Sequence, residues 1–353
     1  MALRDPSAFP AERPPRPERE PAAPTARVTP RVYFVDEDGG TRRELSKQQL
    51  AEVVRARRGQ LWLDIDAARE EEWLLLSEIF RFHPLAIEDT RSPQGRVKFE
   101  EYEGYVFVVV RGIRFAHWTP DPYDIETINL NVFLGSNFLV TVHSDAMPSI
   151  ETVAERLDAG AEALGRGVGQ LMHMALDTLV DLYFPLLDEI DSFVDELEGE
   201  IFGGKTADVM ERIFGLKRSL LALRRHLAPM REVMATLANR PNPFLKPETQ
   251  VYFRDVYDHV VRQVESVEMY RDLLTGAMES HLSVVSNRMN EVIKALSVIA
   301  TVVLPPTFIA SLYGMNFEWM PFLHSPLGFW FALVLMALIT GGLGAYLWWR
   351  GWL

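Results

Sequence analysis

A long run near the C-terminus constrains this chain more than any other part of its sequence. From residue 279 to residue 314, residues that are almost all small or polar recur at alternating spacings of four and three, a period of 3.5 that keeps one seam of a helix on one side. No charged residue occurs from Ala295 to Tyr313. An apolar helix with a polar stripe fits a segment whose outside meets lipid and whose stripe meets water, as in the wall of a pore. The seam consists of Glu279, Ser283, Ser286, Asn290, Ile293, Ser297, Ala300, Leu304, Thr307, Ser311 and Gly314.

Ordinary helix packing inside a membrane also favours small residues along one stripe, and it is the alternative interpretation of this seam. However, Glu279 and Asn290 continue the same register on one side of the uncharged run, and Asn316 stands just beyond it on the other. Polar groups at both ends favour a water-filled path. We therefore predict that the pore is lined by Glu279, Asn290, Ile293, Ser297, Leu304, Thr307 and Ser311.

A second apolar segment, Gly328 to Trp349, has 22 uncharged residues and is long enough to cross a bilayer. Residues 314–327 form the connecting loop, which holds no Lys or Arg, whereas Arg288, Lys294 and Arg350 lie at the opposite ends of the two spans. The positive-inside rule then predicts a cytoplasmic C-terminus at 350–353, a cytoplasmic N-terminal part and an external loop.

The rest of the chain divides by composition. Residues 1–30 hold eight of the 22 prolines, which predicts a disordered tail. Residues 31–165 alternate strand-like and helical patterns and are predicted to form a cytoplasmic α/β domain. Glycine, serine and asparagine at 135–137 predict a hairpin turn, and Pro84 and Pro148 predict first-turn positions of helices. The strand-like runs are Val32–Val35, Leu61–Ile65, Lys98–Phe115 and Ile125–Val142, and a helical run extends from Asp66 to Phe82.

Helical spacing then dominates. Residues 166–246 are predicted to form a hairpin of two helices, Gln170 to Phe202 and Ala207 to Asn239, with an acidic tip on the first and basic residues on the second. The acidic run is a solvated helix face or, alternatively, a surface that concentrates cations. Residues 247–313 are predicted to form one helix, roughly 100 Å long at about 1.5 Å per residue. A helix of that length needs partners, which implies oligomerisation.

Several classes of function are disfavoured. The net charge of -13 argues against nucleic-acid binding, and the absence of cysteine excludes disulfides and thiolate metal sites. Residues 199–206 match the P-loop pattern, but the residues before Gly199 are acidic and helical, so no nucleotide site is expected. No arrangement of residues typical of an enzyme is present in the sequence.

Five consecutive residues carry a resemblance to a known family. Tyr313-Gly314-Met315-Asn316-Phe317, followed by Glu318-Trp319-Met320-Pro321 at the end of the first span, resembles the signature of the CorA family of divalent-cation channels. Further similarity lies in residues 252–259, 283–287 and 290–292, and from His83 to Asp89. The similarity extends from about residue 60 to the C-terminus.

The resemblance implies a funnel-shaped homopentamer in the inner membrane of a prokaryote, with an α+β cytoplasmic domain (an α/β/α sandwich), a long stalk helix and two transmembrane helices. It implies a selectivity filter of Gly314, Met315 and Asn316, with Glu318 in the external loop. Asn316 would hold hydrated Mg2+, and Ile293 and Leu304 would be apolar constrictions. Asp89 and Asp255 would bind a regulatory Mg2+ between subunits.

Three departures from the family pattern are expected to tune the pore. Apolar Leu304 and Ile293 stand where methionine is usual, Glu279 stands where an aspartate is usual, and Phe322 replaces a glutamate of the external loop. The cargo is expected to be Mg2+, with Co2+ and Ni2+ as secondary ions. The alternatives are a related branch that transports Zn2+ with protons, and a membrane-anchored sensor that does not conduct.

Overall fold

Runs of β-branched and aromatic residues build a seven-stranded mixed sheet with the order β2-β1-β3-β7-β6-β5-β4. The only parallel pair among these described strands is β3 with β7, in which Leu61 lies opposite Phe138 and Asp66 opposite His143. The strands are β1 Arg31–Val35, β2 Thr41–Arg42, β3 Gln60–Asp66, β4 Lys98–Tyr102, β5 Tyr105–Phe115, β6 Ile125–Gly135 and β7 Phe138–His143. The structure, a computed structural model, describes residues 30–66, 70–92, 95–116, 119, 123–160, 162–203, 208–315, 321 and 325–352.

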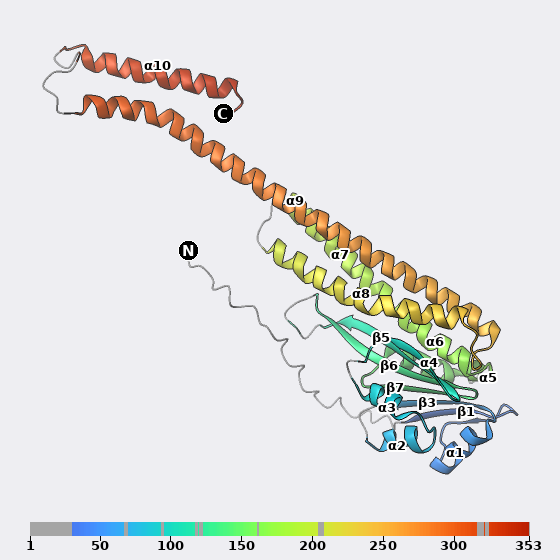
Figure 1. The fold of residues 1–353 in the computed structure, drawn as a ribbon. Helices are drawn as coiled ribbons and strands as arrows, with labels where there is room; N and C mark the ends of the chain where they lie inside the picture. Colours follow the sequence, from blue (N-terminus) through green and yellow to red (C-terminus); the bar gives the residue numbers. More distant parts are fainter. Residues whose placement is uncertain are drawn as a thin grey trace. The chain divides into compact units, whose positions relative to one another are not determined.

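Helices cover both faces of the sheet (Figure 1). On one face α1–α3 enclose a core in which Phe82 stacks on Phe133 with ring centres 4.0 Å apart. On the other face α4, α6 and α8 contact the strands or one another. This three-layer arrangement confirms the predicted α/β/α sandwich. The helices are α1 Lys47–Ala56, α2 Glu70–Glu78, α3 Pro84–Arg91, α4 Pro148–Ala159, α5 Glu162–Gly165, α6 Val168–Asp181, α7 Tyr183–Phe202, α8 Val209–Asn239, α9 Pro247–Tyr313 and α10 Gly328–Trp349.

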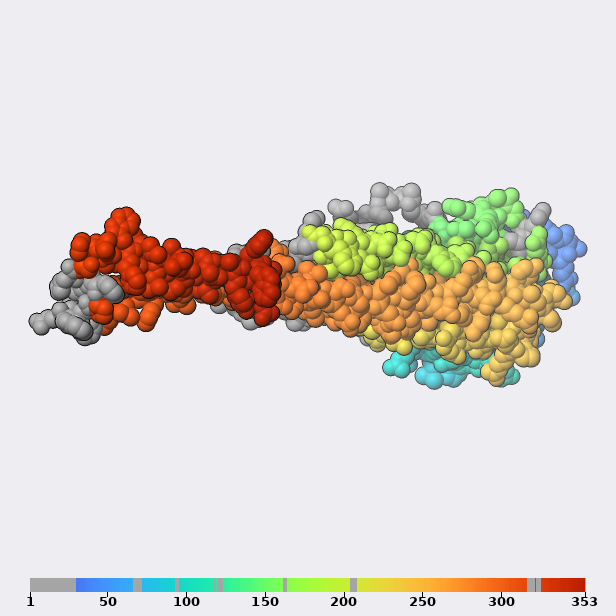
Figure 2. Space-filling view, turned by 90° about the horizontal axis from the view of Figure 1, so that it is seen from above, coloured from blue at the N-terminus to red at the C-terminus, as the bar shows by residue number. Residues whose placement is uncertain are grey.

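The chain separates into two units. Unit 1 comprises residues up to 198 together with 208–275, and unit 2 comprises 199–207 and 276–353. In unit 1 the first half of α9 lies alongside the shorter helices (Figures 1 and 2). Gln263 donates a hydrogen bond to the carbonyl oxygen of Val180, and Arg224 pairs with Glu268 at 2.7 Å. In unit 2 the second half of α9 is followed by α10.

Two of the predicted boundaries were wrong for identifiable reasons. Asp66 does not begin a helix, because it belongs to β3 and pairs with β7; α2 begins only at Glu70. The predicted helix from Gln170 to Phe202 is interrupted at Leu182. Pro185 explains the break, because it has no N–H to donate to the carbonyl of Asp181 and its ring would clash there.

Other boundaries were confirmed. The hairpin between β6 and β7 turns at Ser136 and Asn137, and both Pro84 and Pro148 lie in the first turn of a helix. The long strand-like run at 98–115 is a second hairpin, with Glu103 and Gly104 between β4 and β5. The helix before Gly203 confirms the helical interpretation of that segment; residues 204–207 lie outside the described residues.

Candidate functional site

The predicted pore-lining residues all lie on the second half of α9, in unit 2. In the single chain these side chains are exposed apart from Ser297, which is half-buried. Leu304 is 65% exposed, and Ile293 is 52% exposed, even though both are apolar. Exposed apolar side chains at this density are expected to face lipid or other subunits rather than bulk water. The other exposed residues of the predicted pore lining are Glu279, Asn290, Thr307 and Ser311.

The second half of α9 has three distinct faces. Its least exposed residues recur at Val298, Val302, Ile309 and Tyr313. Lys294 continues this stripe and donates to the carbonyl oxygen of Gly351, just after α10, at 2.7 Å. At about 100° per residue, the predicted seam lies roughly 150° away from this stripe. The packing of α10 therefore leaves the seam exposed within the chain, apart from the half-buried Ser297.

The third face is apolar. It consists of Val292, Leu296, Ile299 and Val303, which are 54–61% exposed. Because it is separate from both the seam and the α10 stripe, this face can contact lipid while the seam contacts water or another copy of the chain. The helix thus has the division of surfaces that a pore wall requires. By length and composition, α9 and α10 can each cross a membrane.

Thr307 shows how a polar side chain is accommodated on such a helix. Its hydroxyl donates to the carbonyl oxygen of Val303, four residues earlier, at 2.8 Å. The proton of the hydroxyl is therefore used within the helix, while the oxygen still has lone pairs that can accept hydrogen bonds. The helix continues past Pro305 and Pro306 to Tyr313, although two backbone donors are missing there.

At the end of α9 the chain leaves the helix through Gly314 and Met315. The amide of Gly314 donates to the carbonyl oxygen of Ala310 at 3.0 Å, and both Gly314 and Met315 are exposed. A β-carbon at Gly314 would lie 3.2 Å from that carbonyl oxygen, which is tight. Asn316 and Glu318, the other predicted residues of the filter and external loop, lie outside the described residues.

The first predicted regulatory carboxylate, Asp89, lies at the end of α3 and has a counter-ion. The ammonium of Lys98 on β4 lies 2.5 Å from a carboxylate oxygen of Asp89 and 2.7 Å from one of Glu100. Burial opposes the charge on Lys98, but the hydrogen bonds that its ammonium donates to the two carboxylates outweigh burial and raise its pKa. Asp89 is therefore held by a cation of the protein itself.

The second predicted carboxylate, Asp255, lies on α9 in unit 1 with a 72% exposed side chain. Its oxygen is 3.8 Å from Nε2 of His259, one turn later. Nδ1 of His259 lies 2.9 Å from Asp181 on α6, and the ligand atoms of Asp177, Asp181 and His259 are all within 4.8 Å of one another. Asp255 has no contact with Asp89 among the described residues of the single chain.

The cluster of Asp177, Asp181 and His259 was not predicted. The sequence nevertheless contains its signal, because Asp177 and Asp181 are four residues apart on one helix, and Asp255 and His259 are four apart on another. Only the fold shows that the two pairs face each other. Carboxylate and imidazole groups together can bind a divalent cation.

Burial, followed by the charges of Asp181 and Asp255, raises the pKa of Asp177, and nearby His173 and His259 oppose the effect. The folded protein therefore keeps this proton to a higher pH than the unfolded chain. The resulting stabilisation is present below pH 3.8 and is lost as pH rises through the raised pKa. Asp177→Asn should remove this dependence, so the variant should gain thermal stability relative to the wild type as pH increases, measured in detergent with a metal chelator. A difference in Tm that is constant between pH 4 and pH 7 would contradict the role of burial.

Comparison with known proteins places this geometry in a family. The family model of the CorA-like Mg2+ transporter protein matches residues 58–348. A putative metal ion transporter of Bacillus subtilis, YfjQ, is 36% identical over 291 residues, covering 82% of this chain and 89% of the relative. The cobalt/magnesium transport protein CorA of Thermotoga maritima is 34% identical over 294 residues, covering 83% of each chain.

A solved structure has the same fold. The complete structure of the CorA magnesium transporter from Methanocaldococcus jannaschii superposes with a TM-score of 0.79 at 24% sequence identity. The match covers 91% of this chain and 98% of that chain. The similarity therefore includes the soluble sandwich, the long helix and the C-terminal apolar helices.

Proposed function

Because the chain belongs to the family of CorA-like Mg2+ transporter proteins, we propose that it is a passive channel for divalent cations, mainly Mg2+. Co2+ and Ni2+ are the proposed secondary ions. One observation carries this proposal: α9 presents a polar seam that α10 leaves uncovered, beside a separate apolar face. Five copies, the number that the family resemblance implies, would enclose a water-filled path between their seams.

The seam suits an ion that keeps its water. Mg2+ dehydrates reluctantly, so a wall that accepts hydrogen bonds from its water shell is better than one that strips the shell. Thr307 has this property, since its own proton is donated to Val303. Gly314, Met315 and Asn316 would form the external filter, where amide and carbonyl oxygens meet the hydrated ion. Glu279 and Asn290 would form polar rings at the cytoplasmic end.

Ile293 and Leu304 would close the path. Their apolar side chains are exposed on the seam between polar positions. Rings of such side chains block ions by excluding water when they approach one another. A small outward movement of α9 would admit water and allow conduction, so no chemical energy would be needed.

Regulation would come from cytoplasmic Mg2+ bound by Asp89 of one subunit and Asp255 of its neighbour. The exposure of Asp255 supports a ligand from outside its own chain. When the ion is absent, carboxylates brought together at the subunit boundary repel one another, which would favour opening. Asp177, Asp181 and His259 would extend this acidic surface beside Asp255.

The membrane potential would supply the driving force. Moving a divalent cation inward across about 100 mV releases about 4.6 kcal/mol, twice the value for a single charge. Both termini would be cytoplasmic and the loop between the two spans external, in the inner membrane of a prokaryote.

Ion uptake into liposomes containing the purified protein tests this function. We expect Mg2+ entry under a voltage alone, with no requirement for a pH gradient. Zn2+ entry that depends on a proton gradient would instead assign the chain to proton-coupled zinc transport. Liposomes with an inactive variant provide the baseline.

A further inference from the structure

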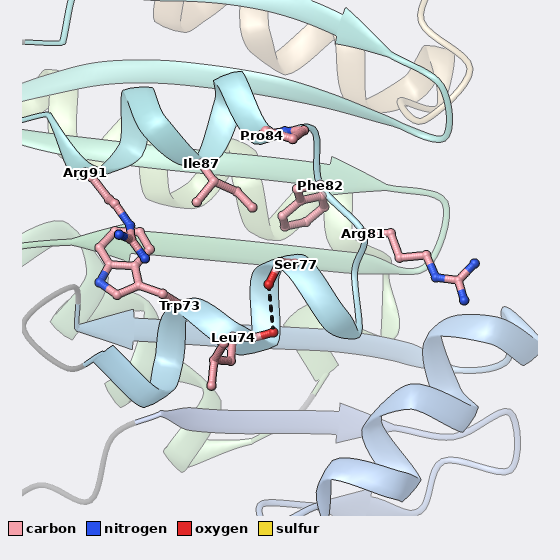
Figure 3. Close-up of a pocket in the computed structure, with 8 residues that line it drawn as sticks. All are labelled: Trp73, Leu74, Ser77, Arg81, Phe82, Pro84, Ile87 and Arg91. Atoms are coloured by element: carbon pink, nitrogen blue, oxygen red, sulfur yellow. Dashed lines mark hydrogen bonds between the residues drawn. The ribbon is translucent and has the colours of Figure 1, made fainter.

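A hollow of about 470 Å³ lies on unit 1, between α2 and α3 (Figure 3). Its lining includes the apolar residues Phe82, on the connection between the two helices, and Pro84 and Ile87, which belong to α3. Arg91 and Arg81 lie at its two ends. Leu74 and Ser77 of α2 complete the wall, with Leu74 48% exposed. None of the proposed ion-binding residues lines the hollow.

The hollow carries positive charge. The guanidinium carbon of Arg91 lies 4.8 Å from the centre of the Trp73 ring, a cation–π contact that leaves its N–H groups free to bind an anion. Neither Arg81 nor Arg91 has an ion-pair partner among the described residues. The two arginines and the apolar floor therefore suit a segment that places a carboxylate beside apolar residues.

The chain itself contains such a segment. Phe9-Pro10-Ala11-Glu12 places an aromatic ring and a proline directly before a carboxylate, within the proline-rich residues 1–29. Aromatic-lined grooves bind proline-containing segments at low entropic cost, because proline already restricts the backbone. The phenyl ring and proline suit the apolar floor, and Glu12 suits an arginine.

The register of the sheet places the start of β1 close to the start of α2. Arg31 of β1 pairs antiparallel with Asp64 of β3, near the end of β3 from which the chain leads to α2. Residues 1–29 therefore precede β1 on the side of the sheet where β3 ends and the chain leads to α2. The 18 residues between Glu12 and Arg31 can extend up to roughly 60 Å, so reach does not limit binding.

We propose that residues 9–12 dock into the hollow between α2 and α3, with Glu12 bound by Arg91. The occupied groove would hold α3, the helix that also carries Asp89. The docking itself goes beyond the proposed channel function and does not depend on it.

Photo-crosslinking of the full-length protein in nanodiscs tests the docking. A benzoyl-phenylalanine residue is introduced at Leu74, and cross-linked peptides are identified by mass spectrometry. We expect cross-links from position 74 to residues 1–29. The matched control is the same substitution at Leu221, a 57% exposed leucine of α8, where no such cross-links are expected.

Charge variants then test the assigned contact. Glu12→Lys should reduce the cross-links from position 74 several-fold, and Arg91→Glu in the same chain should restore them in part. Cross-links from position 74 to another segment, to another subunit's folded surface or to nothing would overturn the proposal, as would a yield unchanged by Glu12→Lys. Ion uptake is not the readout, so this result is independent of the channel assignment.

Discussion

Asn316→Ala is expected to abolish Mg2+ uptake while leaving the oligomer intact. The side-chain amide oxygen would accept hydrogen bonds from the water shell of the ion, and alanine offers no replacement. A hydrogen bond to a charged group contributes about 1.5–3 kcal/mol, so the loss from every subunit should lower uptake by well over about tenfold.

The measurement is Mg2+ uptake into liposomes at equal protein content, with the oligomer checked by size. Asn287→Ala provides a matched control, because Asn287 is an exposed asparagine of α9 outside the seam. Uptake near the wild-type level in Asn316→Ala would contradict the assignment of the filter. Loss of uptake in both variants would indicate a general defect of α9.

Lys98→Met and Asp89→Asn are expected to shift inhibition by cytoplasmic Mg2+ in opposite directions. Lys98 lies 2.5 Å from Asp89, so a regulatory cation must compete with this ammonium for the same carboxylate. Removing the ammonium should therefore increase the inhibitory potency of Mg2+. Removing the charge of Asp89 should decrease it, and each shift should be up to about fivefold, since one exposed ion pair contributes about 0.2–1 kcal/mol.

These shifts can be measured as the internal Mg2+ concentration that halves uptake into liposomes. Glu126→Gln is a suitable control, because Glu126 pairs with Arg114 elsewhere in the sheet. Suppose that Lys98→Met left the half-inhibitory concentration unchanged while Asp89→Asn raised it. The proposed competition between Lys98 and the cation would then be contradicted, but the regulatory role of Asp89 would stand.

The long helices could be predicted because their sequence patterns extend over many consecutive residues. The bounds of α9 and α10 follow from Pro247, the absence of charge and the polar residues that end each run, and the structure confirms both helices. The hairpin at Ser136 was predictable for a similar reason, since local turn chemistry determines it. Such features depend on neighbouring residues in the sequence.

The wrong and missed predictions concern features that depend on residues far apart in the sequence. Asp66 is a typical first residue for a helix, but its pairing with His143 on β7 keeps it in a strand. Lys98 was not identified as a partner of Asp89, and His259 was not identified as a partner of Asp181, because both contacts depend on tertiary packing. The pore-lining and filter assignments remain predictions, because they depend on the proposed assembly of five copies of the chain.

Thiol modification of α9 tests the central claim that its seam lines a water-filled path. The chain has no cysteine, so single cysteines can be introduced without a background. Ser311→Cys lies on the exposed seam, and Val303→Cys lies on the apolar face, where Val303 is 54% exposed. A thiol reacts as the thiolate, which forms readily in water and poorly in lipid.

The measurement is Mg2+ uptake before and after treatment with a charged, water-soluble thiol reagent, with both variants first shown to conduct. We predict that the reagent blocks uptake through Ser311→Cys and has no effect on Val303→Cys. Block of Val303→Cys alone, or modification of Ser311→Cys without any change in uptake, would contradict the account, because the seam would then lie outside the conduction path.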